Sequence, residues 1–430
     1  MGIAALTRRL AGARAGTWLG LALAGAAIHA ALWLISEPAE FFSDFYKAYY
    51  PVAELLLNDG PLPTWHQEET SAVGFVNIPI LGYLFVPLAL LDERTAAWAF
   101  LALGAAASLG AWALLGRLAG LDARRSLALL FLFLANGPLV NSLREGNTTH
   151  FVLVLLILAL VLLRDRAEFA AGVVLGVCGV IKLPLLLFGL YFAVRGRWRA
   201  VAGGAAAVGA TALLSLAVFG FETNRGWYTC CVEPFMSSVI PAFNVQSIDG
   251  FLMRLATGAA RLQEWEPLAP SAAHRLVRLV LVAALFAGIF WLIWRGRRQA
   301  PVGVSAGLGA RDLLEFVLVL NLALVTTPVS WSHYYLWLLL PWGLYLGGRL
   351  PLPDDAVTRW MMWGGLVLSA LPVVVFPLAP GWLGGLAART IVSAWLIGGL
   401  LTLAALARGA LRVHAAREPG AVRDRVAAAS

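Results

Sequence analysis

The run HFVLVLLILALVLL occupies residues 150–163 and is apolar from its second residue onward, and similar runs recur along the whole chain. A helix of about 17–25 apolar residues crosses the roughly 30 Å hydrocarbon core of a bilayer. The 430 residues are 60% hydrophobic and 13% charged, with a mean hydropathy of +0.79, whereas soluble domains are about 25% charged. We therefore expect an all-α polytopic membrane protein that forms a single membrane domain over residues 1–430.

We expect a bundle of about 11–13 transmembrane helices. The apolar runs lie at 17–36, 95–116, 126–140, 150–163, 168–181, 183–194, 200–219, 276–294, 312–327, 334–348, 360–378 and 389–408. A further run, 76–91, is short and contains Pro79, Gly82 and Pro87. Such a segment is either a re-entrant or interfacial helix or a full crossing, and the sequence leaves both open.

The distribution of Lys and Arg favours the topology in which 76–91 does not cross. That topology gathers most of the 32 basic residues on one side, which the positive-inside rule assigns to the cytoplasm. Both termini, including a basic tail at 409–430, are then cytoplasmic, and large loops at 37–75 and 220–275 are extracytoplasmic. We expect a multi-pass protein of a bacterial inner (plasma) membrane, in contact with its lipids. The net charge of +8 does not indicate a nucleic-acid partner, because no basic run is interleaved with base-stacking aromatics.

Asp44 lies in the stretch FFSDFYKAYY (41–50), directly after the first predicted helix. A carboxylate flanked by aromatics at the point where a helix leaves the bilayer is placed to accept a proton from a substrate at the membrane surface. The alternative is that Asp44 only caps a helix over 45–57. The two roles are compatible, and we predict that Asp44 is functional.

Lys182 is the clearest ionisable residue between two apolar runs. It lies in GVIKLPLL (179–186), where Pro184 is expected to break the helix. Ionisable groups at membrane depth are costly unless they face a polar cavity, so such a residue marks a candidate site. A lysine there suits a phosphate; the alternative is that its side chain snorkels to the interface.

Two further polar segments are expected on the same side of the membrane. In NSLREGNTTH (141–150), Arg144 suits a phosphate or carboxylate, although the segment also fits an ordinary polar hairpin in which Arg144 and Glu145 balance each other's charge. In TTPVSWSHYY (326–335), His333 suits hydrogen bonding to a phosphate or proton transfer. The aromatic residues around it also fit an interfacial belt.

Several classes of enzyme have no support in the sequence. There is no glycine-rich phosphate loop, no His-Glu-x-x-His and no Gly-x-Ser-x-Gly. The three cysteines have no metal-ligand spacing. A carboxylate, a lysine, an arginine and a histidine on one side instead favour transfer of a group from a lipid-linked phosphate.

Six short motifs follow one another along the chain: a loose Ser-Asp-Phe…Tyr-Tyr (43–50), NIPILGY (77–83), REGN (144–147), GVIKLP (179–184), FNVQS (243–247) and PVSWSHY (328–334). With these motifs in this order the chain resembles glycosyltransferase family 87, whose members have the GT-C fold and use polyprenyl-phosphate sugars. The chain departs from the family in having REGN where Gly-Gln-x-Asn is usual and Ile-Pro-Ile where Tyr-Pro-Pro is usual. These departures leave the donor sugar and the acceptor open.

The resemblance implies an inverting hexosyltransferase, with mannose as the first expectation, that acts on the extracytoplasmic face. Asp44 would be the general base, and Lys182, Arg144 and His333 would bind the donor phosphate. Substrate contacts are expected from Tyr49, Tyr50, Asn147, Asn244, Trp331 and Tyr334. The donor would be a polyprenyl-phosphate lipid and the acceptor a glycolipid or glycan, with no cofactor and no metal.

Two other functions compete with this one. A transporter or flippase for a lipid-linked or anionic solute would use the same Lys182 and Arg144, but transporters commonly contain paired broken helices in two repeated halves. Only the break after Lys182 is visible, with no counterpart in the second half of the chain. A structural scaffold would tolerate every single polar substitution.

Overall fold

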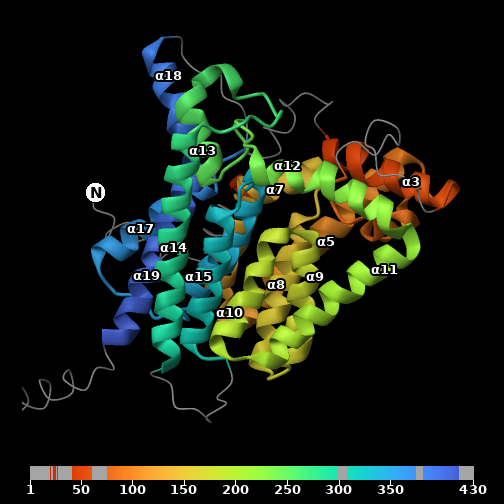
Figure 1. Cartoon of the computed structure of the whole chain (residues 1–430). Helices are drawn as coiled ribbons and strands as arrows, with labels where there is room; N and C mark the ends of the chain where they lie inside the picture. The colour runs from red at the N-terminus through yellow and green to blue at the C-terminus, as the bar shows by residue number, and fades with distance from the viewer. Residues whose placement is uncertain are drawn as a thin grey trace, which may run out of the picture.

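The structure is a computed structural model that describes residues 20, 23–25, 27, 41–60, 75–298, 308–373 and 381–415. The predicted helix 17–36, residues 61–74 of the first loop and most of the tail 409–430 therefore lie wholly or largely outside the described residues. Within the described ranges the protein is helical, and β-structure is limited to two isolated bridges. Figure 1 shows the helices side by side in one assembly.

The α-helices of the described chain include most of the predicted apolar runs and several short helices outside them. They are α3 (Tyr50–Asn58), α5 (Glu93–Ala119), α6 (Ala123–Leu134), α7 (Gly137–Glu145), α8 (Thr149–Arg164), α9 (Glu168–Ile181), α10 (Leu187–Arg195), α11 (Trp198–Cys231), α12 (Glu233–Ser237), α13 (Ile248–Thr257), α14 (Ala272–Arg298), α15 (Ala310–Thr326), α16 (Leu339–Leu346), α17 (Ala356–Ser369), α18 (Trp382–Arg389) and α19 (Ala394–Ala415).

Four helical stretches of the described chain are long and apolar enough to cross a membrane: α5, α11 with α12, α14, and α18 with α19. Only 17% of the most apolar part of α14 is buried in the protein. Apolar surface on this scale is unfavourable in water and fits the hydrocarbon of a bilayer. The chain is therefore an all-α polytopic integral membrane protein.

The predicted number of crossings is larger because many apolar helices are short. The pair α6 and α7 passes the length test only if counted as one span, and it is bent by 54°. Helices α8 and α9 are among those of 10–17 residues. These short helices lie between longer ones, so their length alone does not show how many of them cross.

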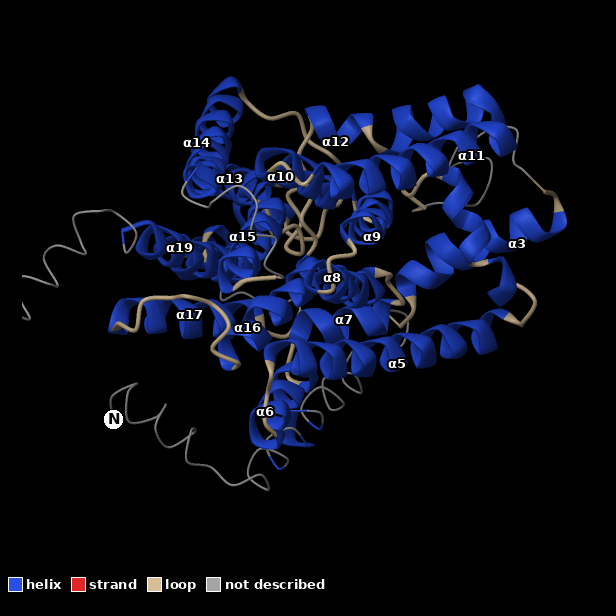
Figure 2. Ribbon diagram, turned by 90° about the horizontal axis from the view of Figure 1, so that it is seen from below, coloured by secondary structure: helices blue, strands red, loops and turns tan. Residues whose placement is uncertain are grey.

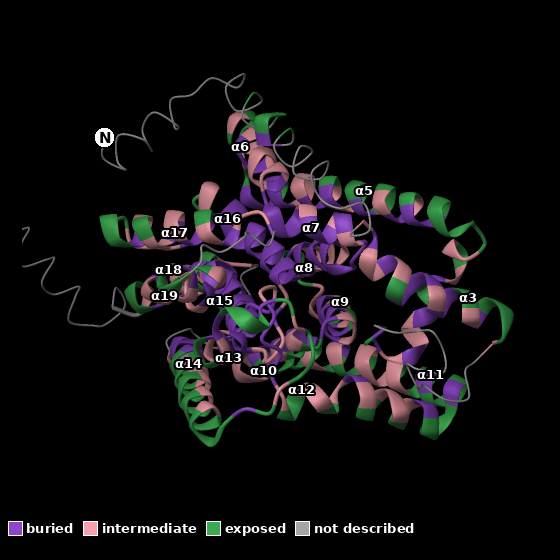
Figure 3. Ribbon diagram, turned by 90° about the horizontal axis from the view of Figure 1, so that it is seen from above, coloured by how far each residue is buried: buried purple, intermediate pink, exposed green. Residues whose placement is uncertain are grey.

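Helices α8 and α15 form the centre of the assembly. All side chains of α15 from Leu313 to Thr326 are buried, and α8 has α5 on one side and α9 on the other (Figure 2). Helices α11 and α14 form part of the outside, where much of their surface is exposed (Figure 3). Residues 316–320 of α15 are apolar without interruption, which is typical of a helix buried in a core or a membrane.

The run predicted as one helix over 126–140 is broken, which corrects the sequence prediction. Asn136 caps α7, because its side chain accepts a hydrogen bond from the backbone N–H of Leu139 (2.9 Å), and Pro138 stands in the first turn. A side chain at Gly137 would collide with the carbonyl oxygen of Leu371, 2.0 Å from its Cβ. The segment predicted as a polar turn at 141–150 is therefore mostly helix, and its polar residues project from the end of α7.

The doubtful run 76–91 forms two 3-10 segments, η3 (Pro79–Leu84) and η4 (Val86–Leu88). They pack against α3, and Gly82 lies where a side chain would meet Val52 and Leu56. At about 2 Å per residue, the stretch Pro79–Leu88 is shorter than a bilayer core. Its length favours an interfacial or re-entrant helix.

The predicted loop 220–275 begins with helix rather than loop. Helix α11 continues past a kink at Gly220 (φ 75°) to Cys231. Beyond α12 the chain runs back to the bundle, and α13 packs on α14 and α18. Val245 forms an antiparallel bridge with Trp331, which joins this loop to the segment that precedes His333.

Candidate active site

Asp44 stands at the N-terminal end of a short π-helix, η2 (Phe45–Tyr49), which leads into α3. π-helical turns are rare and occur frequently at functional sites. The Asp44 side chain makes no capping hydrogen bond, so capping alone does not explain it. The turn before it is fixed by Phe42, which has φ 58° and donates its backbone N–H to the carbonyl of Arg144 (2.7 Å).

Asn147 connects Asp44 to Lys182. Its Nδ2 donates to Oδ2 of Asp44 (2.6 Å), and its Oδ1 accepts from Nζ of Lys182 (3.3 Å). Oδ1 also accepts from the backbone N–H and the hydroxyl of Thr149, at 3.0 and 2.6 Å. Because three donors converge on one amide atom, that atom is the oxygen, and the NH₂ group must face Asp44.

Lys182 lies at the break between α9 and η5 (Leu183–Leu186), where Pro184 begins a new helical segment. Its side chain is buried, and besides Asn147 it approaches the ring of Tyr334, 5.0 Å from Nζ to the ring centre. This position contradicts the alternative that Lys182 snorkels to the membrane interface. A buried ammonium at this position can supply the positive charge of an anion-binding site.

His333 opens η7 (Ser332–Leu338), and its Nδ1 lies 3.3 Å from Oε2 of Glu145, the last residue of α7. Arg144, one position earlier, donates from Nη2 to Oδ1 of Asn141 (2.8 Å). Sequence reasoning treated Glu145 only as a charge balance for its neighbour. His333 lies nearly half the chain away from Glu145, and nothing in the sequence indicated that these two residues would be in contact.

The electrostatic surroundings of Asp44 favour its protonated form. Partial burial in the protein raises its pKa above the ordinary value, and the nearby Glu145 carboxylate raises the pKa further. His333, the hydrogen bond from Asn147 and Lys182 act in the opposite direction but do not offset the rise. A carboxylate with a raised pKa is a stronger base once ionised.

The aromatic residues predicted to contact substrate fall into two groups. Tyr334 stacks on Trp337 at 4.9 Å between ring centres, and Tyr49 lies with its hydroxyl 3.5 Å from that of Thr148, next to Asn147. Both are therefore beside the Asp44–Lys182 link. Tyr50 instead donates its hydroxyl to the carbonyl of Leu91 (2.9 Å).

Asn244 and Trp331 stand on the paired segments next to His333. The carbonyl of Asn244 accepts from the N–H of Ser332 (2.7 Å), and its side-chain oxygen accepts from the indole of Trp265 (3.0 Å). The ring of Trp331 lies nearly parallel to that of His333, 6.4 Å between centres. The second loop thus reaches the same region as the first.

The sequence profile described as glycosyltransferase family 87 matches residues 75–320. The chain belongs to glycosyltransferase family 87. The matched range contains Glu145, Asn147 and Lys182, whereas Asp44 and His333 lie outside it. The resemblance predicted from short motifs is confirmed, and the protein is a membrane glycosyltransferase.

Two proteins of Mycolicibacterium smegmatis are similar to this family 87 member. One is a polyprenol-phosphate-mannose-dependent alpha-(1-2)-phosphatidylinositol pentamannoside mannosyltransferase, 30% identical over 75% of this chain and 70% of its own length. The other is a polyprenol-phosphate-mannose-dependent alpha-(1-2)-phosphatidylinositol mannoside mannosyltransferase, 26% identical over 46% of this chain and 42% of its own length. No solved structure matches the chain.

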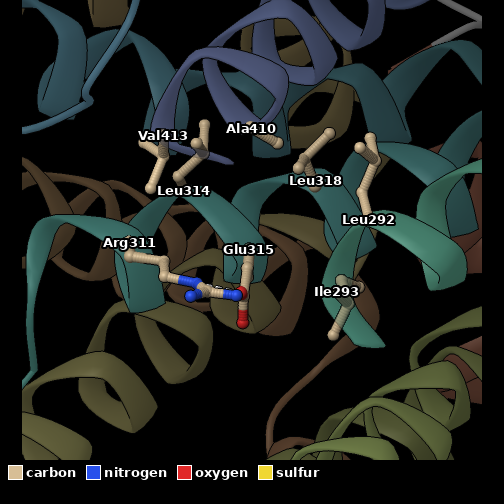
Figure 4. A pocket seen from close by; sticks show the side chains of 8 residues that line it. All are labelled: Leu292, Ile293, Arg311, Leu314, Glu315, Leu318, Ala410 and Val413. Carbon is tan, nitrogen blue, oxygen red and sulfur yellow. Dashed lines mark hydrogen bonds and ion pairs between the residues drawn. The ribbon is translucent and has the colours of Figure 1, made fainter. Parts of the chain in front are cut away.

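A second polar cluster lies at the opposite end of α15 from His333. Arg195 contacts Asp312 (3.0 Å) and Glu315 (3.1 Å), and Arg311 contacts Glu315 (2.8 Å). This network indicates a structural role for Asp312 and Glu315. Figure 4 shows the adjoining cavity, which is lined by Leu292, Ile293, Arg311, Leu314, Glu315, Leu318, Ala410 and Val413. Its volume of about 10 Å³ suits one water molecule and excludes a sugar.

Among the residues that the structure describes, no group of three or more His, Cys, Asp or Glu side chains gathers as a metal site would require. In the part of the chain that the structure describes, Cys178, Cys230 and Cys231 form no disulfide bond. Whether this family 87 enzyme needs a metal stays a prediction from its sequence.

Proposed function

We propose that the protein transfers a hexose, in the first instance mannose, from a polyprenyl-phosphate sugar to a lipid or glycan acceptor. Support for the donor comes from the two similar proteins, both named for their dependence on polyprenol-phosphate-mannose. Both are also named for phosphatidylinositol mannoside acceptors, which supports a lipid-anchored acceptor here. The observation that carries the proposal is the hydrogen-bonded link from Asp44 through Asn147 to Lys182.

In the proposed reaction, Asp44 is the general base. The acceptor hydroxyl gives its proton to the carboxylate while its oxygen attacks the anomeric carbon of the donor sugar. The bond from that carbon to the phosphate oxygen breaks, and its electron pair leaves with polyprenyl phosphate. A single displacement of this kind inverts the configuration at the anomeric carbon.

The leaving phosphate gains negative charge as that bond breaks, so cations beside it stabilise the transition state. We assign Lys182, Arg144 and His333 to the donor phosphate. Lys182 and His333 are buried and act electrostatically on Asp44, which supports a base and a phosphate site that adjoin each other. Substrate contacts are assigned to Tyr49, Tyr50, Asn147, Asn244, Trp331 and Tyr334.

We assign the site to the extracytoplasmic face of a bacterial inner membrane, with both termini in the cytoplasm. The charge distribution along the sequence supports this orientation. The polyprenyl chain of the donor would remain among the membrane lipids while its phosphate enters the site. No cofactor is required, because the donor already carries an activated sugar.

The test is transfer of radiolabelled sugar from polyprenyl-phosphate-mannose to a membrane lipid extract. Wild type is compared with Asp44→Asn, and Asp59→Asn provides a matched control because Asp59 is an exposed acid at the end of α3. Label transferred by wild type and the control but lost in Asp44→Asn supports the proposal. Retained transfer in Asp44→Asn refutes the base, and donor binding without transfer by any protein points to a transporter or flippase.

A further inference from the structure

Glu145 and His333 lie on separate helical segments, α7 and η7, and are brought together by the fold. Glu145 ends α7, and the chain then turns at Gly146, whose φ of 68° is left-handed. A side chain at Gly146 would lie 2.7 Å from Cβ of Phe45, so the turn is packed against the helix that follows Asp44. The backbone around Glu145 is therefore held in place by the Asp44 segment itself.

His333 is held from the other side. The N–H of Ser332 donates to the carbonyl of Asn244, and the N–H of Gln246 donates to that of Ser330 (2.7 and 2.5 Å). Gln246 is in turn fixed by Tyr335, whose hydroxyl donates to its carbonyl (2.6 Å). The backbone on both sides of the histidine is thus hydrogen-bonded to one sequence-distant segment, residues 244–246.

The two nitrogens of His333 have different surroundings. Nδ1 faces the Glu145 carboxylate, which can only accept, so Nδ1 carries a proton. Nε2 is buried and makes no hydrogen bond to any part of the chain that the structure describes. The charged or titratable groups that act on this ring besides Glu145 are Lys182, Asp44 and His150.

We propose that Glu145 is a positioning residue that fixes His333 with Nδ1–H on its carboxylate, and that His333 takes up a proton on Nε2 when a lipid phosphate binds beside Lys182. The inference rests on the proposed function, because it assumes that a lipid phosphate enters this site. It goes further by naming the residue that orients His333 and the protonation change that accompanies binding.

Charge counting supports the proton uptake. With His333 neutral and both acids ionised, the empty site holds the carboxylates Asp44 and Glu145 against two cations, Lys182 and Arg144. A phosphate adds at least one more negative charge in surroundings where opposite charges strongly favour one another. A proton on Nε2 then gives the phosphate a further charged donor beside Lys182 and Arg144, and Glu145 supplies the counter-charge on the far side of the ring.

The test is calorimetric binding of a short-chain polyprenyl phosphate to the full chain in detergent. Titration at pH 8 in two buffers of different ionisation enthalpy gives the protons taken up per phosphate bound, and at this pH the free phosphate is a dianion. Asp44→Asn is measured beside wild type, because it removes the other acid that acts on the ring. We expect uptake of close to one proton in both, and almost none in His333→Gln.

Two substitutions at Glu145 test its role: one removes the negative charge, and the other keeps the charge but shortens the side chain. Glu145→Gln keeps an acceptor for Nδ1–H but removes the charge, so the pH above which uptake ceases moves down by about one unit or more. At pH 8 the phosphate then binds roughly tenfold more weakly. Glu145→Asp keeps the charge and recovers part of the uptake. Glu233→Gln, the same change at an exposed acid, leaves both quantities at wild-type values.

The outcomes separate this inference from the proposed function. If wild type binds no polyprenyl phosphate, the proposed function fails, and the inference fails with it. If wild type binds phosphate without taking up a proton, or if His333→Gln takes up as much as wild type, the inference is refuted while phosphate binding stands. If Glu145→Gln retains wild-type uptake and affinity at pH 8, Glu145 has no such role.

Discussion

Replacement of Asn147 by Leu removes the group that connects the base to the lysine while keeping nearly the same shape. The wild-type amide donates to Asp44 at 2.6 Å and accepts from Lys182 at 3.3 Å. A hydrogen bond to a charged group contributes about 1.5–3 kcal/mol. Loss of the bond to Asp44 alone therefore lowers kcat/KM about 10- to 150-fold, since each 1.4 kcal/mol is tenfold in rate.

The assay is initial-rate transfer of labelled mannose at saturating acceptor, with donor concentration varied. The donor KM should also rise, because Lys182 loses the acceptor that orients it. Asn58→Leu, at an exposed position near the end of α3, serves as the matched control. If Asn147→Leu transfers sugar within twofold of wild type while correctly folded, the link does not align the base, and the reasoning is refuted.

Three further changes test other parts of the site. Lys182→Met should raise the donor KM about 10- to 150-fold, as loss of a charged hydrogen bond to phosphate implies, whereas Lys47→Met at an exposed site should not; equal effects would contradict the assignment. Gly146→Ala places a Cβ on a residue with a left-handed φ, 2.7 Å from Cβ of Phe45. It should therefore destabilise the fold by about 2–5 kcal/mol. An unchanged melting temperature in detergent would disprove this. Asp44 must be ionised to accept a proton, so transfer falls as the pH drops through its raised pKa; a rate that stays constant down to about pH 4, the ordinary aspartate range, would show that Asp44 is not the base.

The fold class was predictable because a helix that crosses a bilayer must be long and apolar, and such runs are visible in the sequence alone. The same runs did not reveal the break at Asn136, because Pro138 is tolerated in the first turn of a helix and interrupts the apolar pattern only slightly. The break matters for the site. Because of the break, Arg144 lies in the last turn of α7 and Asn147 follows shortly after that helix, whereas the sequence predicted a polar turn here.

The site was predictable in part, from ionisable residues in places where burial is costly. Asp44, Lys182 and Asn147 come together as three sequence segments, and His333 joins through a partner that the sequence did not indicate. Glu145 looked like a surface charge because an acid beside an arginine is common in turns. Only the path of the backbone, with Gly146 turned against Phe45, brings that acid to the histidine.

The pairing of Glu145 with His333 also has a consequence for biosynthesis. Asp44, Asn147 and Lys182 emerge from the ribosome well before His333. At about 5–20 residues per second, roughly ten to forty seconds separate the synthesis of residues 145 and 333. A nascent chain therefore carries the base and the lysine for some time without the histidine. A polypeptide that terminated within this interval would lack His333 and therefore part of the proposed donor-phosphate site.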